Sequence, residues 1–143
     1  MSKSIAIIQS NYIPWKGYFD MIGLVDEFIF YDEVQYTKND WRNRNKIKTQ
    51  TGVQWLTIPV YQKRLDQRIK ETEISDKKWA DKHWRSLNTN YSKAPCFKQV
   101  SPILEEFYTQ NKSILLSEIN QELVKLVCDF VGIKTKISNS INF

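Results

Sequence analysis

The sequence predicts an α/β fold with a parallel sheet, a β-hairpin and a helical second half, and three observations support this prediction. An apolar run at residues 4–9 and an aromatic run at residues 27–31 flank a segment with helical spacing, which is typical of a strand–helix–strand unit. Gly52 separates two short runs with strand character. From about residue 77 to residue 131, apolar side chains recur at helical spacing. The 143 residues fit one domain that can bury a core.

The first strand and the first helix follow from the opening residues. Residues 4–9 are almost continuously apolar, which is typical of a strand buried on both faces of a parallel sheet. Asn11 can cap the chain that follows, and Pro14 suits a first helical turn because its missing N–H is not needed there. We therefore expect a helix from about Pro14 to Gly23. The strand at residues 27–31 should then pair in parallel with the first strand through a right-handed connection.

The middle of the chain is predicted to be mostly loop around one hairpin. Residues 32–45 are too polar for an element that is buried on both sides, and we expect a long functional loop there. Residues 46–49 and 53–60 should form the two strands of the hairpin about Gly52. Residues 61–76 are charged and should form an exposed connection with at most one short strand.

Three helices and a final strand are expected in the second half. Pro95 separates the first two helices, and Gly132 suits the C-terminus of the third because it tolerates a left-handed conformation. Residues 133–138 alternate in polarity and predict a last strand. A strand in a doubly wound sheet normally leads into another helix and strand. We therefore expect residues 1–143 to form a single α/β domain that is either a minimal version of such a sheet or lacks its C-terminal part.

Composition narrows the classes of protein and of site. Hydrophobic residues make up 41 % and charged residues 26 %, with no apolar run long enough to span a bilayer, so we expect a cytoplasmic protein without a membrane span. Cys96 and Cys128 lack metal-type spacing and His83 is the only histidine, which excludes a histidine-rich zinc site. The net charge of +5 is concentrated in clusters, most sharply at residues 38–48. Such a surface suits a phosphorylated small molecule, nucleic acid or an anionic membrane.

Polar and aromatic residues gather just past the predicted ends of the first two strands, which is where open α/β sheets bind ligands. The start of the first helix offers free N–H groups to an anion, and Gly17 lets a ligand or another backbone approach closely. Arg42 and Arg44 are the expected anion clamps, and Trp41 offers a stacking face. The candidate substrate-binding residues are Gln9, Asn11, Tyr12, Trp15, Gly17, Tyr18, Gln35, Trp41, Arg42, Asn43, Arg44 and Lys46.

Two residues are candidate catalytic groups. Asp32 directly follows the second strand and could act as a general base, accept a sugar hydroxyl, bind Mg²⁺ or pair with a nearby arginine. His83 is the only side chain whose ordinary pKa suits proton transfer near neutrality, although a lone helical histidine is more often packed. Structural roles stay open elsewhere too, since Gly17 could ease helix–sheet packing and Asn11 could cap a turn. We expect no residues that bind a metal ion by themselves, and Mg²⁺ remains a candidate cofactor.

Several segments resemble the WbqC-like protein family. The likeness is carried in collinear order by residues 8–20 (Ile-Gln-Ser-Asn-Tyr-Ile-Pro-Trp-Lys-Gly-Tyr-Phe-Asp), 30–38, 40–47, 55–60, 90–97 and 128–137. The resemblance implies a bacterial protein of O-antigen or other surface-polysaccharide synthesis that modifies an amino sugar or moves an acyl or aminoacyl group onto one. Family members usually continue well past residues 133–138, which implies that this chain is a fragment or a short form.

Residues 9–18 are also similar to the strand-to-helix signature of nucleotidylyltransferases. Those enzymes place two histidines around a glycine, where they hold the phosphates of a nucleotide. Trp15, Gly17 and Tyr18 occupy the corresponding positions here. Since neither aromatic residue is a cation, the likeness implies a Rossmann-like, nucleotidyltransferase-like architecture rather than that phosphate chemistry.

The leading hypothesis is a transferase-like enzyme that binds a phosphorylated donor, such as a nucleotide-sugar or an acyl or aminoacyl donor. One alternative is a basic nucleic-acid-binding module with Tyr36, Trp41 and Trp55 as stacking groups, although nucleic acid is the less favoured partner. Another is a non-catalytic assembly subunit whose free sheet edge pairs with another chain, including a second copy in a homo-oligomer.

Overall fold

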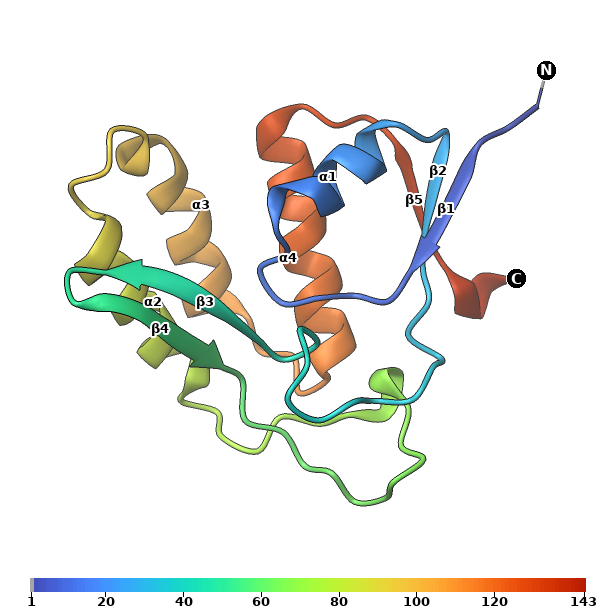
Figure 1. The fold of residues 1–143 in the computed structure, drawn as a ribbon, viewed down its shortest axis with the longest axis horizontal. Coiled ribbons are helices and arrows are strands. Elements are labelled where there is room, and N and C mark those ends of the chain that lie inside the picture. The colour runs from blue at the N-terminus through green and yellow to red at the C-terminus, as the bar shows by residue number, and fades with distance from the viewer. Residues whose placement is uncertain (1) are drawn as a thin grey trace.

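The computed structural model describes residues 2–143 and contains a three-stranded parallel sheet (Figure 1). Strands β1 (Ile5–Ile8), β2 (Glu27–Phe30) and β5 (Lys136–Asn139) lie in the order β1-β2-β5. Helix α1 (Lys16–Gly23) connects β1 to β2, which pair in parallel. The predicted parallel strand–helix–strand unit and the last strand are therefore confirmed.

Strands β3 (Arg44–Thr49) and β4 (Gly52–Thr57) form an antiparallel hairpin that is separate from the parallel sheet. The predicted hairpin is confirmed, but both strands begin earlier than expected, and β4 also ends earlier, at Thr57. β4 stops before Pro59, which has no N–H to donate to a ladder. Beyond it, Val60 and Ile74 form an isolated antiparallel bridge.

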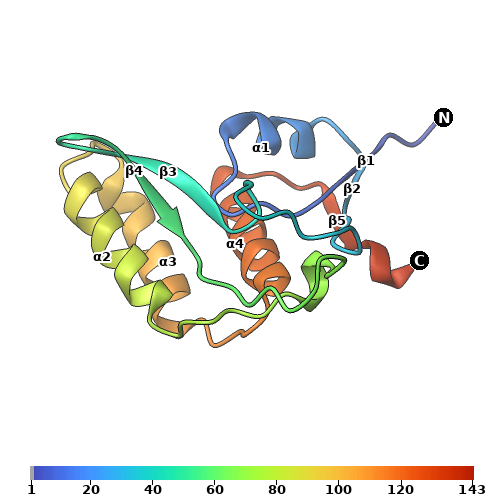
Figure 2. The ribbon, with the colours of Figure 1, turned by 60° about the horizontal axis from the view of Figure 1, so that its bottom comes forward.

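Helices α2 (Trp79–Tyr91), α3 (Phe97–Gln110) and α4 (Leu116–Val131) confirm the predicted helical second half. The hairpin, α2 and α3 lie together on one side of the molecule, and α4 stands between this group and the parallel sheet (Figures 1 and 2). Gly132 ends α4 in the left-handed conformation, with φ at 80°, as its position after the apolar pattern predicts.

Helix α4 contributes to two hydrophobic cores. Leu116, Ile119 and Leu123 belong to the larger core, which the hairpin, α2 and α3 complete. Val124 and Cys128 belong to a smaller core beneath the parallel sheet. The helix is therefore the element that joins the two halves of the molecule.

The prediction that the first strand is buried on both faces is wrong. Ile5 and Ile7 are 50 % and 57 % exposed, whereas Ala6 and Ile8 pack against the smaller core. The reason is that α1 and α4 both pack on the same face of the sheet, the face that carries Phe28. β2 is buried along its whole length because it is the central strand.

The two long connections, residues 31–43 and 58–78, hydrogen-bond to each other. The backbone N–H of Tyr36 donates to the Gln67 carbonyl over 2.7 Å. The 3₁₀ helix η1 (Ile69–Glu71) lies where at most one short strand was expected, and a second 3₁₀ turn, η2 (Ser140–Asn142), follows β5. No helix within residues 2–143 is long and apolar enough to cross a membrane.

Candidate functional site

The segments that follow β1 and β2 meet at the carboxyl end of the sheet and enclose a cavity. Backbone hydrogen bonds join them, from Tyr31 N–H to the Ile8 carbonyl over 2.9 Å and from Tyr12 N–H to the Trp41 carbonyl over 3.1 Å. The space between them, which we call the polar cavity, has a volume of about 330 Å³ and is lined by Asn11, Pro14, Trp15, Trp41 and Asn45. The fold thus brings together the two polar segments that the sequence places after the first two strands.

Helix α1 begins later than predicted, at Lys16, and no side chain caps it. Trp15 occupies the N-cap position, so the predicted cap by Asn11 is wrong. The reason is that the Asn11 Oδ1 accepts a hydrogen bond from the Arg42 guanidinium instead. The uncapped first turn of α1 therefore borders the polar cavity through Trp15.

Trp15 also explains the glycine two residues later. Its indole is 71 % exposed and lies over Gly17, where a Cβ would come within 2.2 Å of the ring. The close approach that Gly17 permits is made by the protein's own indole. Trp15 can therefore lie flat against the start of α1 while its outer face stays open to solvent.

Asn45 stabilises an unusual backbone conformation beside the cavity. Its Nδ2 donates to the Ile13 carbonyl and also lies 3.3 Å from the Tyr12 carbonyl. Ile13 has φ at +46°, a left-handed conformation that costs a β-branched residue about 1–3 kcal/mol. Asn45 was not among the predicted binding residues, and its contacts show that it shapes the turn before α1.

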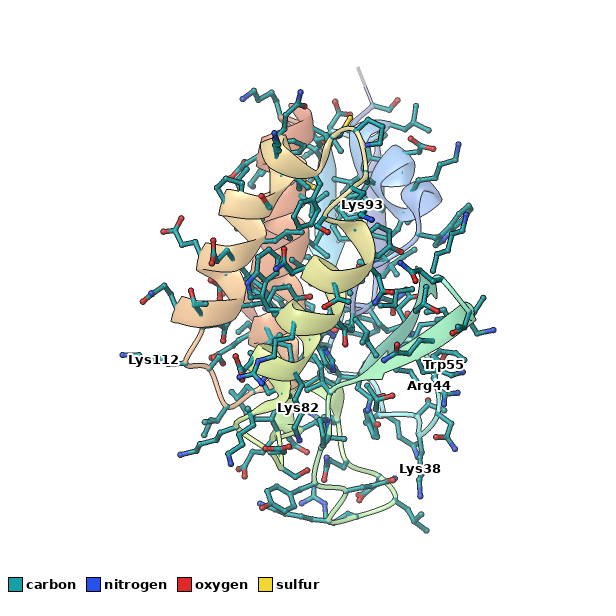
Figure 3. The ribbon with its side chains drawn as sticks, turned by 90° about the vertical axis from the view of Figure 1, so that its left-hand side faces the viewer. Lys38, Arg44, Trp55, Lys82, Lys93 and Lys112 are labelled. Atoms are coloured by element: carbon teal, nitrogen blue, oxygen red, sulfur yellow. The ribbon has the colours of Figure 1, made fainter. Side chains whose placement is uncertain are left out.

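An aromatic pair and two cations lie beside the polar cavity, and Figure 3 shows that Arg44 and Trp55 come from the hairpin. The rings of Trp41 and Trp55 have centroids 5.7 Å apart, and both side chains are partly exposed. The Arg44 guanidinium lies 4.2 Å from the Trp55 centroid, and the Lys46 ammonium lies 4.8 Å from it. Exposed indole faces next to cations can bind a flat ring and a phosphate that adjoins it.

Asp32 lies in a buried hydrogen-bond network and not on the wall of the polar cavity. Its Oδ1 accepts from the Ser10 backbone N–H over 2.7 Å, and its Oδ2 accepts from the Ser117 hydroxyl and from the Gln121 amide over 3.1 Å. Within residues 2–143 no cation pairs with it. Because Ser117 lies in the first turn of α4, the positive end of that helix dipole faces the carboxylate. The carboxylate therefore ties the ends of β1 and β2 to α4.

Polar residues of α4 complete this network, and the sequence reasoning did not identify them. Asn120 donates to the Arg42 carbonyl over 2.7 Å and lies 3.3 Å from the Ser10 hydroxyl. Gln121 accepts from the Asn139 amide over 3.1 Å at the end of β5. One signal for them was present in the sequence. Ser117, Asn120 and Gln121 are polar, but they fall on the face of α4 that the apolar spacing assigns to the core.

His83 belongs to a buried chain of hydrogen bonds with two tyrosines. The Thr57 carbonyl, 3.0 Å from Nε2, can only accept, so Nε2 carries the proton. Nδ1 then accepts from the Tyr12 hydroxyl over 2.8 Å, and the Tyr12 oxygen accepts from the Tyr108 hydroxyl over 2.6 Å. Burial lowers the pKa of His83 to about 4 and raises the pKa of both tyrosines. The imidazole is therefore neutral at physiological pH, and none of these groups lines the polar cavity.

The other predicted residues lie around the site without lining the cavity. Tyr18 is buried, and its hydroxyl donates to the Gln9 carbonyl over 2.9 Å. Asn43 is buried and donates to the Ile58 carbonyl over 2.9 Å. Gln35 is exposed on the connection after β2. In the part of the chain that the structure describes, no group of three or more histidine, cysteine, aspartate or glutamate side chains could hold a metal ion.

The fold and the site define an α/β protein with a polar cavity at the end of a three-stranded parallel sheet. The chain belongs to the WbqC-like protein family, whose model matches residues 9–143. It is also 50 % identical over 142 residues to Rv1507c of Mycobacterium tuberculosis, a protein described as uncharacterised. The aligned part is 99 % of this chain and 62 % of that relative, so the chain spans less than two thirds of the relative's length. No solved structure matches the chain. The family resemblance seen in the sequence is therefore confirmed.

Proposed function

We propose that this protein binds a phosphorylated donor in the polar cavity and acts as a transferase in the synthesis of bacterial surface polysaccharide. The observation that carries the proposal is a cavity of about 330 Å³ that two indoles line and that has three cations beside it. The cations are Arg42, Arg44 and Lys46. Nucleotide-sugars and acyl or aminoacyl carriers built on a nucleotide all combine a flat ring with phosphate groups, and the site offers a partner for each part.

The phosphate groups are assigned to the start of α1 and to the neighbouring guanidinium groups. An uncapped helix start presents backbone N–H groups and the positive end of the helix dipole. Arg42 already orients Asn11 at this position, and Arg44 extends the positive charge toward the hairpin. The base or another flat ring of the donor is assigned to the pair of Trp41 and Trp55.

Asp32 and His83, the two candidate catalytic residues, are given positioning roles in this proposal. Both side chains are buried, and the polar atoms of each already have hydrogen-bond partners. Asp32 holds the Ser10 backbone at the end of β1, and the chain from His83 fixes Tyr12, whose N–H is bonded to Trp41. Each therefore supports a segment that carries cavity residues.

The unit formed by β1, α1 and β2 also supports the proposal of a Rossmann-like, nucleotidyltransferase-like architecture. The cavity lies past the carboxyl ends of parallel strands, as is typical of nucleotide sites in such folds. Trp15 and Tyr18 replace the two histidines of the signature that the sequence resembles. Tyr18 faces the smaller core, so phosphate binding here would depend on arginine and the helix start.

The test is a thermal-shift and calorimetric screen with nucleotide-sugars, acyl-CoAs, free nucleotides and inorganic phosphate, each with and without Mg²⁺. A ligand that binds only the folded protein raises its melting temperature by mass action. We expect one donor class to bind, and Arg44→Ala and Trp41→Ala each to weaken it at least about tenfold, because a charge-assisted bond or a stacking face is lost. Arg42→Ala should do the same, but it also releases Asn11 and is the less clean variant.

Lys112→Ala is the matched control, because Figure 3 shows Lys112 on the opposite side of the molecule from Arg44 and Trp55. The proposal fails if no donor binds the folded protein, or if Arg44→Ala and Trp41→Ala bind it as tightly as the parent does. Preferential binding of single-stranded oligonucleotides, with affinity falling steeply as salt rises, would favour the nucleic-acid alternative at the same indoles.

A further inference from the structure

A second, apolar groove adjoins the polar cavity. It consists of two hollows of about 240 Å³ and 320 Å³ that share the side chains of Ile13, Leu87, Val100 and Leu104. The first hollow extends between α1 and α4, and the second extends along α2 and α3 toward β3. The remaining lining residues are Pro14, Phe19, Tyr108, Leu123 and Val127 in the first hollow and Lys46, Ile47, Tyr91, Ala94, Cys96 and Phe97 in the second.

The groove and the polar cavity share a wall. Pro14 lines both the polar cavity and the first hollow, and Ile13 lines both hollows of the groove. The left-handed backbone of Ile13 and the hydrogen bond from Asn45 to its carbonyl fix this wall. A ligand that crosses Ile13 and Pro14 would therefore pass directly from the polar cavity into the apolar groove.

The chemistry of the groove selects a hydrocarbon and not a sugar ring. Its side chains are apolar except at three places, Tyr108 in the first hollow and Lys46 and Tyr91 in the second. The Tyr108 hydroxyl is already bonded to Tyr12, and the Tyr91 hydroxyl already accepts from the Lys48 N–H over 2.9 Å. Sugar hydroxyls would find few partners there, and unpaired polar groups oppose binding.

We infer that this groove binds the acyl chain of the donor whose phosphorylated end occupies the polar cavity. The inference rests on the proposed function and narrows its donor class to an acyl carrier. Lys46 matches the charge of such a donor, because its ammonium lies beside Trp55 at the polar site and its side chain also lines the groove. Continuity through Ile13 and Pro14 and this placement of a cation favour an acyl chain that is covalently attached to an anion.

The test measures affinity for CoA and for acetyl-, butanoyl-, hexanoyl-, octanoyl- and decanoyl-CoA by calorimetry. Each methylene that enters an apolar site should tighten binding about fourfold, until the groove is full and the gain stops. Val100→Trp should abolish this gain because the indole fills the region that the two hollows share. Ile103→Trp is the matched control, since Ile103 is half-buried on the same helix but does not line the groove.

A measurement on the unsubstituted protein keeps the test independent of folding defects. Cys96 lines the second hollow and is exposed, whereas Cys128 is buried, so a thiol reagent reports on the groove in the folded state. We expect octanoyl-CoA to slow the reaction of Cys96 at least about tenfold when it is saturating, and CoA alone to slow it much less.

The possible failures are distinguishable. If CoA binds but longer chains bind no more tightly and do not protect Cys96, the groove does not hold the chain, and the proposed donor cavity stands. If CoA and every other phosphorylated donor fail to bind, the proposed function fails. If octanoate or octyl glucoside still protects Cys96 in that case, the groove remains a site for a hydrocarbon chain, but without the phosphorylated donor.

Discussion

At the scale of single residues, His83 gives the clearest link between burial and pH. Its one free acceptor, Nδ1, is used by Tyr12, and its N–H is used by the Thr57 carbonyl. Protonation would place a second donor against the Tyr12 hydroxyl in a buried setting. Burial, which disfavours the charged imidazolium, lowers the pKa of His83 from its ordinary 6.5 to about 4.

We expect the protein to lose stability as the pH falls from about 6.5 to about 4, because the unfolded chain takes up a proton on His83 in that window and the folded chain does not. With about 1.4 kcal/mol for each pKa unit, the loss from this group reaches about 2–3 kcal/mol at the acid end. Urea unfolding at a series of pH values measures it. His83→Gln should be less stable at neutral pH but should show a flatter profile.

The titration of Glu27 sets the lowest pH at which the slope of the stability profile can be assigned to His83. Its pKa is lowered to about 2, first by the hydrogen bond from Lys3 and then by Ser138, so its stabilisation is present above pH 4.5 and is lost below it. Glu27 contributes equally to the parent and to His83→Gln, and the slope of each profile should be compared above about pH 4.5, where Glu27 does not titrate. Equal slopes for the two proteins in the range above that value would contradict the assigned role of His83.

At the scale of elements, two glycines stand at helix ends but differ in backbone conformation. Gly132 has φ at 80°, and the Ile133 N–H then donates to the Cys128 carbonyl over 2.9 Å, which closes α4. Gly23 also stands at a helix end, but its φ is not in the left-handed range, and a Cβ there would lie 3.9 Å from Ile133. The same substitution should therefore have opposite effects at the two sites.

Gly132→Ala should lower the free energy of unfolding by about 1 kcal/mol, because a Cβ is strained at this φ although no atom lies within 4 Å of it. Gly23→Ala should be neutral or raise the free energy of unfolding by up to about 1 kcal/mol, through helix propensity and a less flexible unfolded chain. Denaturant unfolding of the two variants side by side measures the difference. A loss at Gly23 equal to that at Gly132 would show that backbone conformation is not the cause.

The elements were predictable where one local signal decides them. Helical spacing, Pro95 and Gly132 located the helices, and the aromatic run from Glu27 predicted the strand β2. The burial of β1 was mispredicted because an apolar sequence does not reveal that two helices choose the same face. The polar network at Asp32 was missed for a similar reason, since the partners on α4 are more than eighty residues away in the chain, as Ser117 shows.

The sequence indicated which segments form the candidate site but not how their side chains are arranged. Asn11, Trp15 and Trp41, which follow the first two strands in the sequence, line one cavity. The sequence did not reveal that Asn45 would support the turn at Ile13 or that Trp55 would stack beside Trp41. Both contacts depend on how the hairpin docks, which no short segment encodes by itself.

At the scale of the whole molecule, α4 couples two cores, while the edge strand β1 exposes Ile5 and Ile7 on the opposite face of the parallel sheet. Leu123 and Val124 are neighbours in sequence but belong to different cores. On the sheet, Ile7 and Ile8 are likewise neighbours, but Ile7 is 57 % exposed and Ile8 packs against the smaller core. Substitutions at Ile7 and at Ile8 therefore test the exposed and the covered face of β1 separately.

We expect Ile8→Thr to lower the free energy of unfolding by about 2 kcal/mol, because it loses apolar burial and introduces a hydroxyl into the smaller core. Ile7→Thr should change it by less than about 0.5 kcal/mol, since threonine is equally compatible with a strand and the site is already in water. Denaturant unfolding at low protein concentration measures both variants, with Val53→Thr on the hairpin as a control for an exposed strand position. A cost at Ile7 that matches the cost at Ile8 would mean that the open face is covered in solution. A cost at Ile7 that appears only at high protein concentration would locate the cover in a second copy of the chain.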